Sequence, residues 1–271
     1  MKPIISALIL FAVSLGAAGV QAQSIQVEGA LARDHVVAPG EIVQDVLTVT
    51  NVGSAPVQVK SYLSDYSYRL DQSNYDAPGT MPRSNAAWIT VAPSLLSLAA
   101  GQRAQIIVQT RVPADGHQEG SYWSIVMVEP QTQVAALAPE QGKTVLGVQS
   151  VFRYGIQILT TIGRTGVAEV KFAGCVCVKQ GTAGQSRRQL QVDLENVGTQ
   201  ALRPLVWAEL HDTDGVLVKR VESHKARLYP GCLQRYELDV TDVAPGRYTV
   251  LAVADNGDEN IFGARYELDL R

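Results

Sequence analysis

The amino-acid sequence predicts an all-β protein built from two similar sandwich domains. Beyond the first 22 residues the chain consists of short runs in which apolar and polar residues alternate, a pattern typical of half-buried strands. Glycine, proline, asparagine and aspartate separate these runs, and helical periodicity is almost absent. The same order of signals then occurs a second time, so we expect two copies of one domain type.

The N-terminal segment has the features of a secretory signal peptide. Lys2 precedes the apolar run ISALILFAVSLGAAGV, and Val20-Gln21-Ala22 resembles a cleavage site. The apolar run is too short to cross a bilayer comfortably. We therefore expect residues 1–22 to be removed, an exported mature chain that starts near Gln23, and no membrane segment after signal removal.

The charge balance disfavours nucleic acid as a partner. The chain has 23 basic and 26 acidic residues and a net charge of −3. A protein that binds a phosphate backbone needs a basic face, which this composition does not supply. About 250 residues remain after the signal, a length that fits two domains of ordinary size.

Each half of the chain repeats a strand that ends in Asn-Val-Gly. These triplets begin at Asn51 and Asn196, and a second strand follows each after a short turn. Further along, the turn glycines Gly101 and Gly231 each precede a strand with alternating apolar residues. The repeat indicates that both domains share one strand order.

Each half also closes on Gly-x-Tyr followed by another strand, with Tyr122 in the first half and Tyr248 in the second. A tyrosine just after such a turn resembles the corner tyrosine of immunoglobulin-like sandwiches, whose hydroxyl bonds back to the backbone. We therefore expect two immunoglobulin-like β-sandwiches and a structural role for both tyrosines. The domains are predicted at 23–162 and 163–271, joined by a short linker within 160–166 that leaves a cleft between them.

Three cysteines lie in the second half: Cys175, Cys177 and Cys232. In an oxidising compartment an odd number predicts one bridge and one spare thiol, here a disulfide from Cys232 to either member of the pair. Val176 and Val178 continue the apolar parity of their strand, so both paired cysteines are expected to face away from the core. Zinc is disfavoured, because Cys-x-Cys with one distant cysteine is a poor ligand set.

No motif for catalysis, a cofactor or a metal is present. The four histidines have no ligand spacing, and neither a nucleophile elbow nor a phosphate-binding glycine loop occurs. The acidic turn at 255–260 lacks the spacing of a calcium loop. We therefore expect a protein that is not an enzyme and that uses neither a cofactor nor a metal.

A tyrosine-rich segment offers one possible binding surface. Tyr66, Tyr68 and Tyr75 lie in a polar stretch between Tyr62 and Trp88. Exposed tyrosines bind glycans or proteins well, because they combine apolar area with a polar tip and few rotamers. The alternative is that Tyr62 and Trp88 belong to the sandwich core while the other three decorate a loop.

A long apolar run, 144–161, stands at the end of the first domain. Most of its even-numbered residues are apolar (Leu146, Val148, Phe152, Tyr154, Ile156 and Ile158), and Arg153 is its only charge. A strand of this kind at a sheet edge invites pairing with another chain, which makes sense when pairing is the function. The alternative is an ordinary last strand that runs into the linker.

The chain resembles the periplasmic chaperones of chaperone–usher pilus assembly. The resemblance rests on VLTVTN (46–51), LAAGQRAQIIVQTRVP (98–113) and VQSVFRYGIQIL (148–159), the last following VMVEP (126–130). It implies a periplasmic protein that donates an edge strand to pilus or surface-structure subunits, with an outer-membrane usher as a further partner.

The resemblance also implies roles for individual residues. Arg153 on the last strand of the first domain would anchor the carboxylate at the subunit's C-terminus, with Arg33 or His35 on the first strand as the second cation. Leu146 and Val148 would be the donor-strand residues that enter the subunit's groove.

A second, weaker resemblance is to exported two-domain proteins of Gram-positive surface complexes, which bind peptidoglycan and partner proteins. It rests on WITVAP (88–93), Gly101 and the VP at 112–113 followed by GSYW (120–123). It implies the alternative function: an exported structural or adhesive module that binds a surface protein or glycan through the tyrosine segment.

Overall fold

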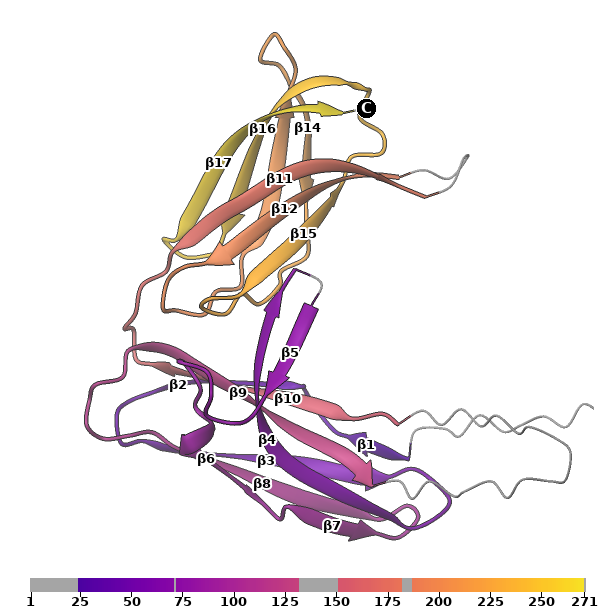
Figure 1. Cartoon of the computed structure of the whole chain (residues 1–271), viewed down its shortest axis with the longest axis vertical. Helices are drawn as coiled ribbons and strands as arrows, with labels where there is room; N and C mark the ends of the chain where they lie inside the picture. The colour runs from indigo at the N-terminus through magenta and orange to yellow at the C-terminus, as the bar shows by residue number, and fades with distance from the viewer. Residues whose placement is uncertain (1–23, 71, 132–150, 182–186, 271) are drawn as a thin grey trace, which may run out of the picture.

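The computed structural model describes residues 24–70, 72–131, 151–181 and 187–270. Within these ranges the protein is almost entirely β, with one short 3₁₀ helix, η1 (Ala86–Trp88). Two sandwiches meet at an angle, so that the molecule has the outline of an L (Figure 1). No helix in the described part of the chain is long and apolar enough to cross a membrane. The predicted fold class, two immunoglobulin-like sandwiches, is confirmed.

The first sandwich packs a four-stranded sheet against a longer one. The smaller sheet has the order β1 (Ile25–Val27), β3 (Ile42–Asn51), β8 (Arg103–Arg111), β6 (Ile89–Ala92). The facing strands are β4 (Val57–Arg69), β9 (Gly120–Gln131), β10 (Tyr154–Ile162) and β2 (Ala32–Val37), and both β5 (Gln72–Asp76) and β7 (Leu95–Leu98) pair with β4. Alternate residues of both sheets, among them Leu47, Ile106 and Ile158, are fully buried between them.

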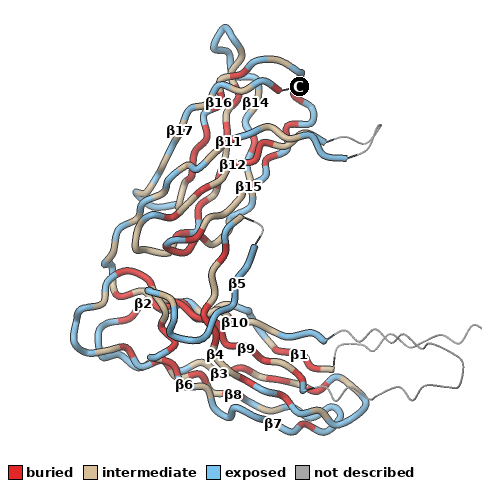
Figure 2. The backbone as a smooth tube through the Cα atoms, viewed as in Figure 1, coloured by how far each residue is buried: buried red, intermediate tan, exposed pale blue. Residues whose placement is uncertain are grey.

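The second sandwich follows the same plan. One layer contains β11 (Val170–Gln180), β12 (Arg187–Asn196) and β15 (Leu233–Asp239). The other has the order β14 (Leu217–Glu222), β13 (Leu205–His211), β16 (Gly246–Asp255), β17 (Ile261–Leu270). Its core forms one buried cluster that runs the length of the domain, as the red segments of Figure 2 show.

One sheet continues from the first sandwich into the second. The order β11-β12-β15-β4-β9-β10-β2 belongs to a single nine-stranded sheet, in which β4 pairs in parallel with β15 through Arg69 and Leu233. The amide of Leu70 donates to the carbonyl of Leu233 at 2.7 Å. The β4–β5 hairpin therefore projects from the first domain and makes backbone contact with the second.

The repeated Asn-Val-Gly triplet has the same structural purpose in both domains. The side-chain amide of Asn51, which is fully buried, donates to the carbonyls of Ala55 (2.9 Å) and Leu98 (3.0 Å), and its oxygen accepts from Gly53 N–H (2.9 Å). Buried backbone carbonyls need such partners. One side chain thus closes a turn and ties it to a neighbouring strand.

Asn196 repeats this arrangement in the second domain. Its amide donates to the carbonyls of Gln200 (2.8 Å) and Leu228 (2.9 Å), and its oxygen accepts from Gly198 N–H (3.0 Å). Asn196 is also fully buried. The sequence repeat therefore corresponds to a repeated hydrogen-bond motif rather than to a coincidence of composition.

The two Gly-x-Tyr tyrosines differ. Tyr248 is a tyrosine corner as predicted, because its hydroxyl donates to the carbonyl of Ala244 at 2.9 Å. Tyr122 instead packs its ring against Trp88, with centroids 4.7 Å apart, and beneath the guanidinium of Arg83. Its role is structural through ring packing.

The predicted orientation of the cysteine pair is wrong. Cys175 is buried in the core of the second domain and Cys177 packs against that core, whereas Val176 is 49% exposed. The cause is an irregularity in β11, where the pairing with β12 shifts between Phe172 and Gly174. One extra residue in a strand moves all later side chains to the opposite face.

The predicted disulfide is also absent, since all three cysteines are free. In the strand order β11-β12-β15, Cys175 pairs with Val192 of β12, while Cys232 precedes β15 and its carbonyl accepts from Asn196 N–H. Two strand spacings alone separate β11 from β15 by roughly 9–10 Å. A disulfide requires Cα atoms within about 7 Å.

Removal of either buried asparagine should destabilise the protein strongly. Asn51→Ala and Asn196→Ala each leave buried carbonyls without donors, so each should lower the free energy of unfolding by about 2–3 kcal/mol. Val52→Ala, at a site that is 49% exposed, is the matched control and should change it by less than about 0.5 kcal/mol. Urea titration followed by tryptophan fluorescence measures all three, and asparagine variants as stable as the control would contradict the role of the motif.

The thiols should be free in solution and unequal in reactivity. Burial raises the pKa of all three thiols, that of Cys175 to about 12, and Arg188 opposes the shift at Cys177. A raised pKa leaves less thiolate at a given pH, so at pH 8 iodoacetamide should label the more exposed Cys177 first. Peptide mapping by mass spectrometry gives the order. Protein denatured without reductant should be labelled at all three positions, and labelling at one position alone would show a disulfide.

Candidate functional site

The last strand of the first domain, β10, has an edge that is only partly covered. The parallel strand β2 pairs with Gln157–Ile162, and no strand among the described residues pairs with the Tyr154–Ile156 part of the same edge. Coverage begins where the amide of Gln157 donates to the carbonyl of Leu31 at 3.0 Å. Since backbone groups alternate along a strand, the amide and carbonyl of Gly155 face the uncovered side.

The open edge arises because the first strand of the domain is divided between two sheets. β1 pairs with β3 in the smaller sheet, and the chain then crosses to the other layer and continues as β2 beside β10 (Figure 1). The crossing segment, residues 28–31, includes Gly29 in the left-handed region (φ 86°). The first half of β10 is therefore left without a neighbour on one side.

Two apolar side chains lie directly before this edge. Val151 is 50% exposed and Phe152 is 57% exposed, whereas Ile156 and Ile158 further along are buried in the core. Of the predicted 144–161 run, residues 144–150 lie outside the described residues, and β10 begins at Tyr154. The predicted donor residues Leu146 and Val148 lie outside the described residues.

Arg153 lies toward the outer end of the β10 face, away from the second domain. It contacts the hydroxyl of Tyr62 on β4, which in turn donates to Glu129 at 3.2 Å. Burial and the Glu129 carboxylate raise the pKa of Tyr62, and Arg153 opposes this shift. Arg153 precedes Gln157 by four residues, a distance of about 13 Å in extended chain. Its role as the anchor of a subunit's C-terminus stays a prediction.

Arg33 and His35 are committed to a partner within their own domain. His35 Nε2 lies 2.8 Å from Asp45 Oδ2, and Arg33 Nε lies 3.6 Å from Asp45 Oδ1. These contacts tie β2 to β3 of the opposite sheet. Alternation along β2 instead turns Asp34 toward the second domain, where Arg227 binds it through two hydrogen bonds of 2.6 and 2.9 Å.

The inter-domain contact is aromatic at its centre. Tyr229 of the second domain stacks on Trp123 of β9, with ring centroids 4.7 Å apart and planes 6° from parallel. Its hydroxyl donates to Gln157 Oε1 at 2.8 Å, and the Tyr68 hydroxyl donates to the carbonyl of Arg227 at 2.5 Å. Burial raises the pKa of both tyrosines well above the ordinary range, so both hydroxyls stay protonated as donors.

A close backbone approach fixes the two domains on the other side of this stack. Ser121 N–H donates to the carbonyl of Thr199 at 2.9 Å, and Ala201 N–H donates to Ser121 Oγ at 2.9 Å. A Cβ atom on Gly120 would lie 2.3 Å from the Thr199 oxygen, so only glycine fits there. The angle between the domains therefore rests on direct contacts as well as on the linker.

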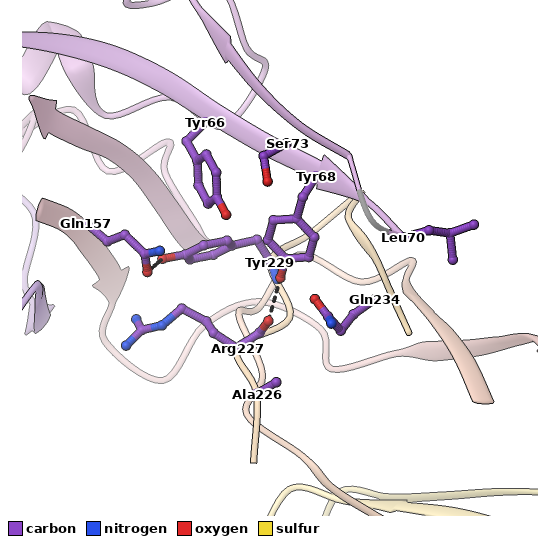
Figure 3. Close-up of a pocket in the computed structure, with 9 residues that line it drawn as sticks. All are labelled: Tyr66, Tyr68, Leu70, Ser73, Gln157, Ala226, Arg227, Tyr229 and Gln234. Carbon is purple, nitrogen blue, oxygen red and sulfur yellow. Dashed lines mark hydrogen bonds between the residues drawn. The ribbon is translucent and has the colours of Figure 1, made fainter. Parts of the chain in front are cut away.

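A cavity of about 270 Å³ opens beside the aromatic contact. Tyr66 and Ser73 enter it from the β4–β5 hairpin, Gln157 from β10, and Arg227, Tyr229 and Gln234 from the second domain (Figure 3). Figure 3 shows the Tyr229 ring lying across the cavity floor with its hydroxyl on Gln157, and Tyr66 pointing toward it from above. In the described part of the chain no group of three or more His, Cys, Asp or Glu side chains could hold a metal.

The tyrosine segment is a hairpin and not a loop. Tyr66 and Tyr68 lie on β4 and Tyr75 lies on β5, so that Tyr66 and Tyr75 face each other across the strands with centroids 5.4 Å apart. Tyr68 is buried between the domains, and Tyr75 is 56% exposed. Of the two residues that the alternative assigned to the core, Trp88 at the end of η1 packs against a buried cluster, whereas Tyr62 on β4 is only half-buried.

The residues that meet in the angle could not be found from the pattern. Nothing in the sequence singles out Asp34 or Arg227, because each belongs to an ordinary strand or turn. The one available signal is Tyr229-Pro230-Gly231, an aromatic residue immediately before a turn in the second domain.

No protein-family model and no curated protein matches the sequence. The solved structures that resemble the chain include pilus chaperones. One belongs to a chaperone–tip adhesin complex of CFA/I fimbriae, with 12% identity and a TM-score of 0.47 over 90% of this chain and 98% of that chain. A chain of the CsuC–CsuE chaperone–tip subunit complex of Acinetobacter baumannii has 13% identity and a TM-score of 0.43, over 90% and 97% of the two chains.

A chain from the Salmonella enterica SafA pilin–SafB chaperone complex has 15% identity and a TM-score of 0.41, covering 92% of this chain and 98% of its own. Identities this low, with TM-scores below 0.5, do not carry an argument about function. The case for a function therefore rests on the open edge of β10 and on the inter-domain angle.

Proposed function

We propose that this protein is a periplasmic assembly chaperone for pilus or surface-structure subunits, which it holds by pairing the open edge of β10 with a strand of the subunit. The observation that carries the proposal is the uncovered Tyr154–Ile156 edge with two exposed apolar residues directly before it. Export to the periplasm follows from the expected signal peptide, and an outer-membrane usher remains an expected second partner from the resemblance alone.

The physical argument concerns the cost of an open edge. An unpaired row of N–H and C=O groups invites association, and natural proteins usually protect it with charges, prolines or a covering segment. Here Val151 and Phe152 add apolar surface to the edge, and Arg153 follows them directly. Such an edge serves strand addition, in which backbone hydrogen bonds supply affinity and alternate side chains supply register.

The second domain provides a wall beside the bound strand. The contacts among Trp123, Tyr229 and Tyr68 hold the angle of the L, so the open edge and the second domain face a partner together. A rigid, preformed surface avoids the entropy cost of ordering two domains on binding. Arg153, at the outer end of this surface, is proposed to contact the partner through its guanidinium.

The adhesive alternative has less support. It required several exposed tyrosines, whereas Tyr68 is buried between the domains and Tyr66 is half-buried against Tyr75. Tyr75 alone of the three is largely exposed.

A charge at the open edge should abolish partner capture. Phe152→Asp places a carboxylate where an apolar side chain would be covered, and burial of an unpaired charge is costly. Protein purified from periplasm should then lose its subunits, measured by mass spectrometry of the copurified material. Val216→Asp is the matched control, an equally exposed valine (60%) in the second domain, and should retain them. Equal retention by both variants would contradict the proposal.

Arg153→Ala should weaken capture without unfolding the first domain, because the side chain is exposed and its described contact is with Tyr62. The expected loss is about tenfold in affinity for a single charge-assisted contact. Thermal unfolding of the variant supplies the control. A lower unfolding temperature, with affinity unchanged for the folded fraction, would make the arginine structural.

A further inference from the structure

We propose that the linker between the domains is rigid and sets their angle before a partner binds, with Gly120 and Gly166 as positioning residues for the partner site. The linker is residues 163–169, between β10 and β11. Its two glycines, Gly163 and Gly166, would by sequence suit a flexible connection. The effect on partner capture rests on the proposed function, whereas the rigidity rests on contacts within the chain itself.

Three stretches of backbone meet at the linker in direct contact. They are the start of β9 at Gly120, the linker at Gly166, and the 196–200 turn of the second domain at Gly198. A Cβ atom on Gly166 would lie 2.5 Å from Gly120 Cα, and one on Gly198 would lie 2.2 Å from the carbonyl oxygen of Val167. The obstructing atoms belong to the backbone, so no change of rotamer could make room for a side chain.

Hydrogen bonds tie the linker to the first domain. Gly120 N–H donates to Thr165 Oγ1 at 2.9 Å, and the same hydroxyl donates to the carbonyl of Ile162 at 2.6 Å. The amide of Gly163 donates to the carbonyl of Val37, at the end of β2, at 2.8 Å. The first half of the linker therefore cannot rotate without breaking bonds to β9 and β2.

A second set of hydrogen bonds ties the linker to the second domain. Val167 N–H donates to Thr199 Oγ1 at 2.9 Å, and the Val167 carbonyl accepts from the amides of Thr199 (2.8 Å) and Gln200 (3.1 Å). The carbonyl of Thr199 also accepts from Ser121 N–H of β9 at 2.9 Å. The first domain, the linker and the second domain are therefore bonded to one another in a closed ring of contacts.

This arrangement is unlike a hinge, whose residues must be able to absorb changes in φ and ψ. A second point of contact lies further along β9, where Trp123 stacks on Tyr229. The second domain is thus held at both Ser121 and Trp123 of one strand, so that rotation about either contact would disrupt the other. We therefore expect the open edge of β10 and the second domain to face a partner at one fixed angle.

The test changes one glycine of the linker and uses the other as its matched control. In Gly166→Ala the new Cβ would meet Gly120 Cα at 2.5 Å, with φ at 91°, so the domains must change their relative orientation. In Gly163→Ala φ is 51°, and none of the described residues has an atom within 4 Å of the new Cβ, so the angle should stay the same.

Residual dipolar couplings of the ¹⁵N-labelled mature chain measure how each sandwich is oriented. In the wild type and in Gly163→Ala, one alignment tensor should fit both sandwiches in the orientation of the structure. In Gly166→Ala each sandwich should fit its own structure but in a different relative orientation. Copurification of subunits from periplasm should fall at least about tenfold in Gly166→Ala and stay at the wild-type level in Gly163→Ala.

Thr165→Val decides the question if the alanine variant does not fold. It adds no bulk but removes the acceptor of the Gly120 amide, so the two sandwiches should no longer share one tensor. A wild-type chain that needs two tensors, an altered angle in Gly163→Ala, or an unchanged angle in both Gly166→Ala and Thr165→Val would overturn the rigid linker. An altered angle with undiminished capture would overturn the positioning role.

The two proposals can fail separately. The couplings are measured without a partner, so they test the rigid linker even if Phe152→Asp retains its subunits and the proposed function is wrong.

Discussion

The arrangement of this molecule depends on the insertion of Tyr229 between the two domains. Its ring is fully buried against Trp123, and its hydroxyl spans to Gln157 on the strand that carries the open edge. The same contact therefore orients the second domain and positions a residue of the candidate site. The rings form a continuous row of contacts that runs from the exposed hairpin into the buried cluster between the domains, in the order Tyr75, Tyr66, Tyr68, Tyr229 and Trp123.

The second determinant is the division of the first strand between two sheets. A sandwich gains hydrogen bonds by pairing every edge, and here β2 covers only the part of β10 that lies near the second domain. Asp45 holds β2 in place through His35 and Arg33. Arg33 and His35, which the sequence offered as cations for a partner, therefore contact Asp45 and hold the covering strand β2 in place. The residue of β2 that faces the second domain is the acid Asp34.

Local patterns in the sequence were sufficient for the fold class and for the repeated motif. Period-two alternation reports burial within one strand, and Asn51 and Asn196 could be matched because each acts on a turn a few residues away. The predicted orientation of the β11 cysteines was wrong for a local reason. The strand is irregular at Gly174, which moves the later side chains to the opposite face of the sheet. A glycine inside a strand pattern was the signal that could have indicated this. The inter-domain contacts could not be predicted for a different reason. Tyr229 and Gln157 are 72 residues apart in the chain, and no local sequence pattern links them.

The pairing of β4 with β15 has a consequence for how the chain folds. Because one sheet crosses the boundary, separation of the domains would expose a backbone edge on β15 and the buried faces of Tyr68, Trp123 and Tyr229 together. Neither sandwich can then lose its structure without removing part of the other's interface, and the free energy of that interface is shared. The interface therefore links the stability of the two sandwiches, so that a partner that binds across both stabilises the contact between them.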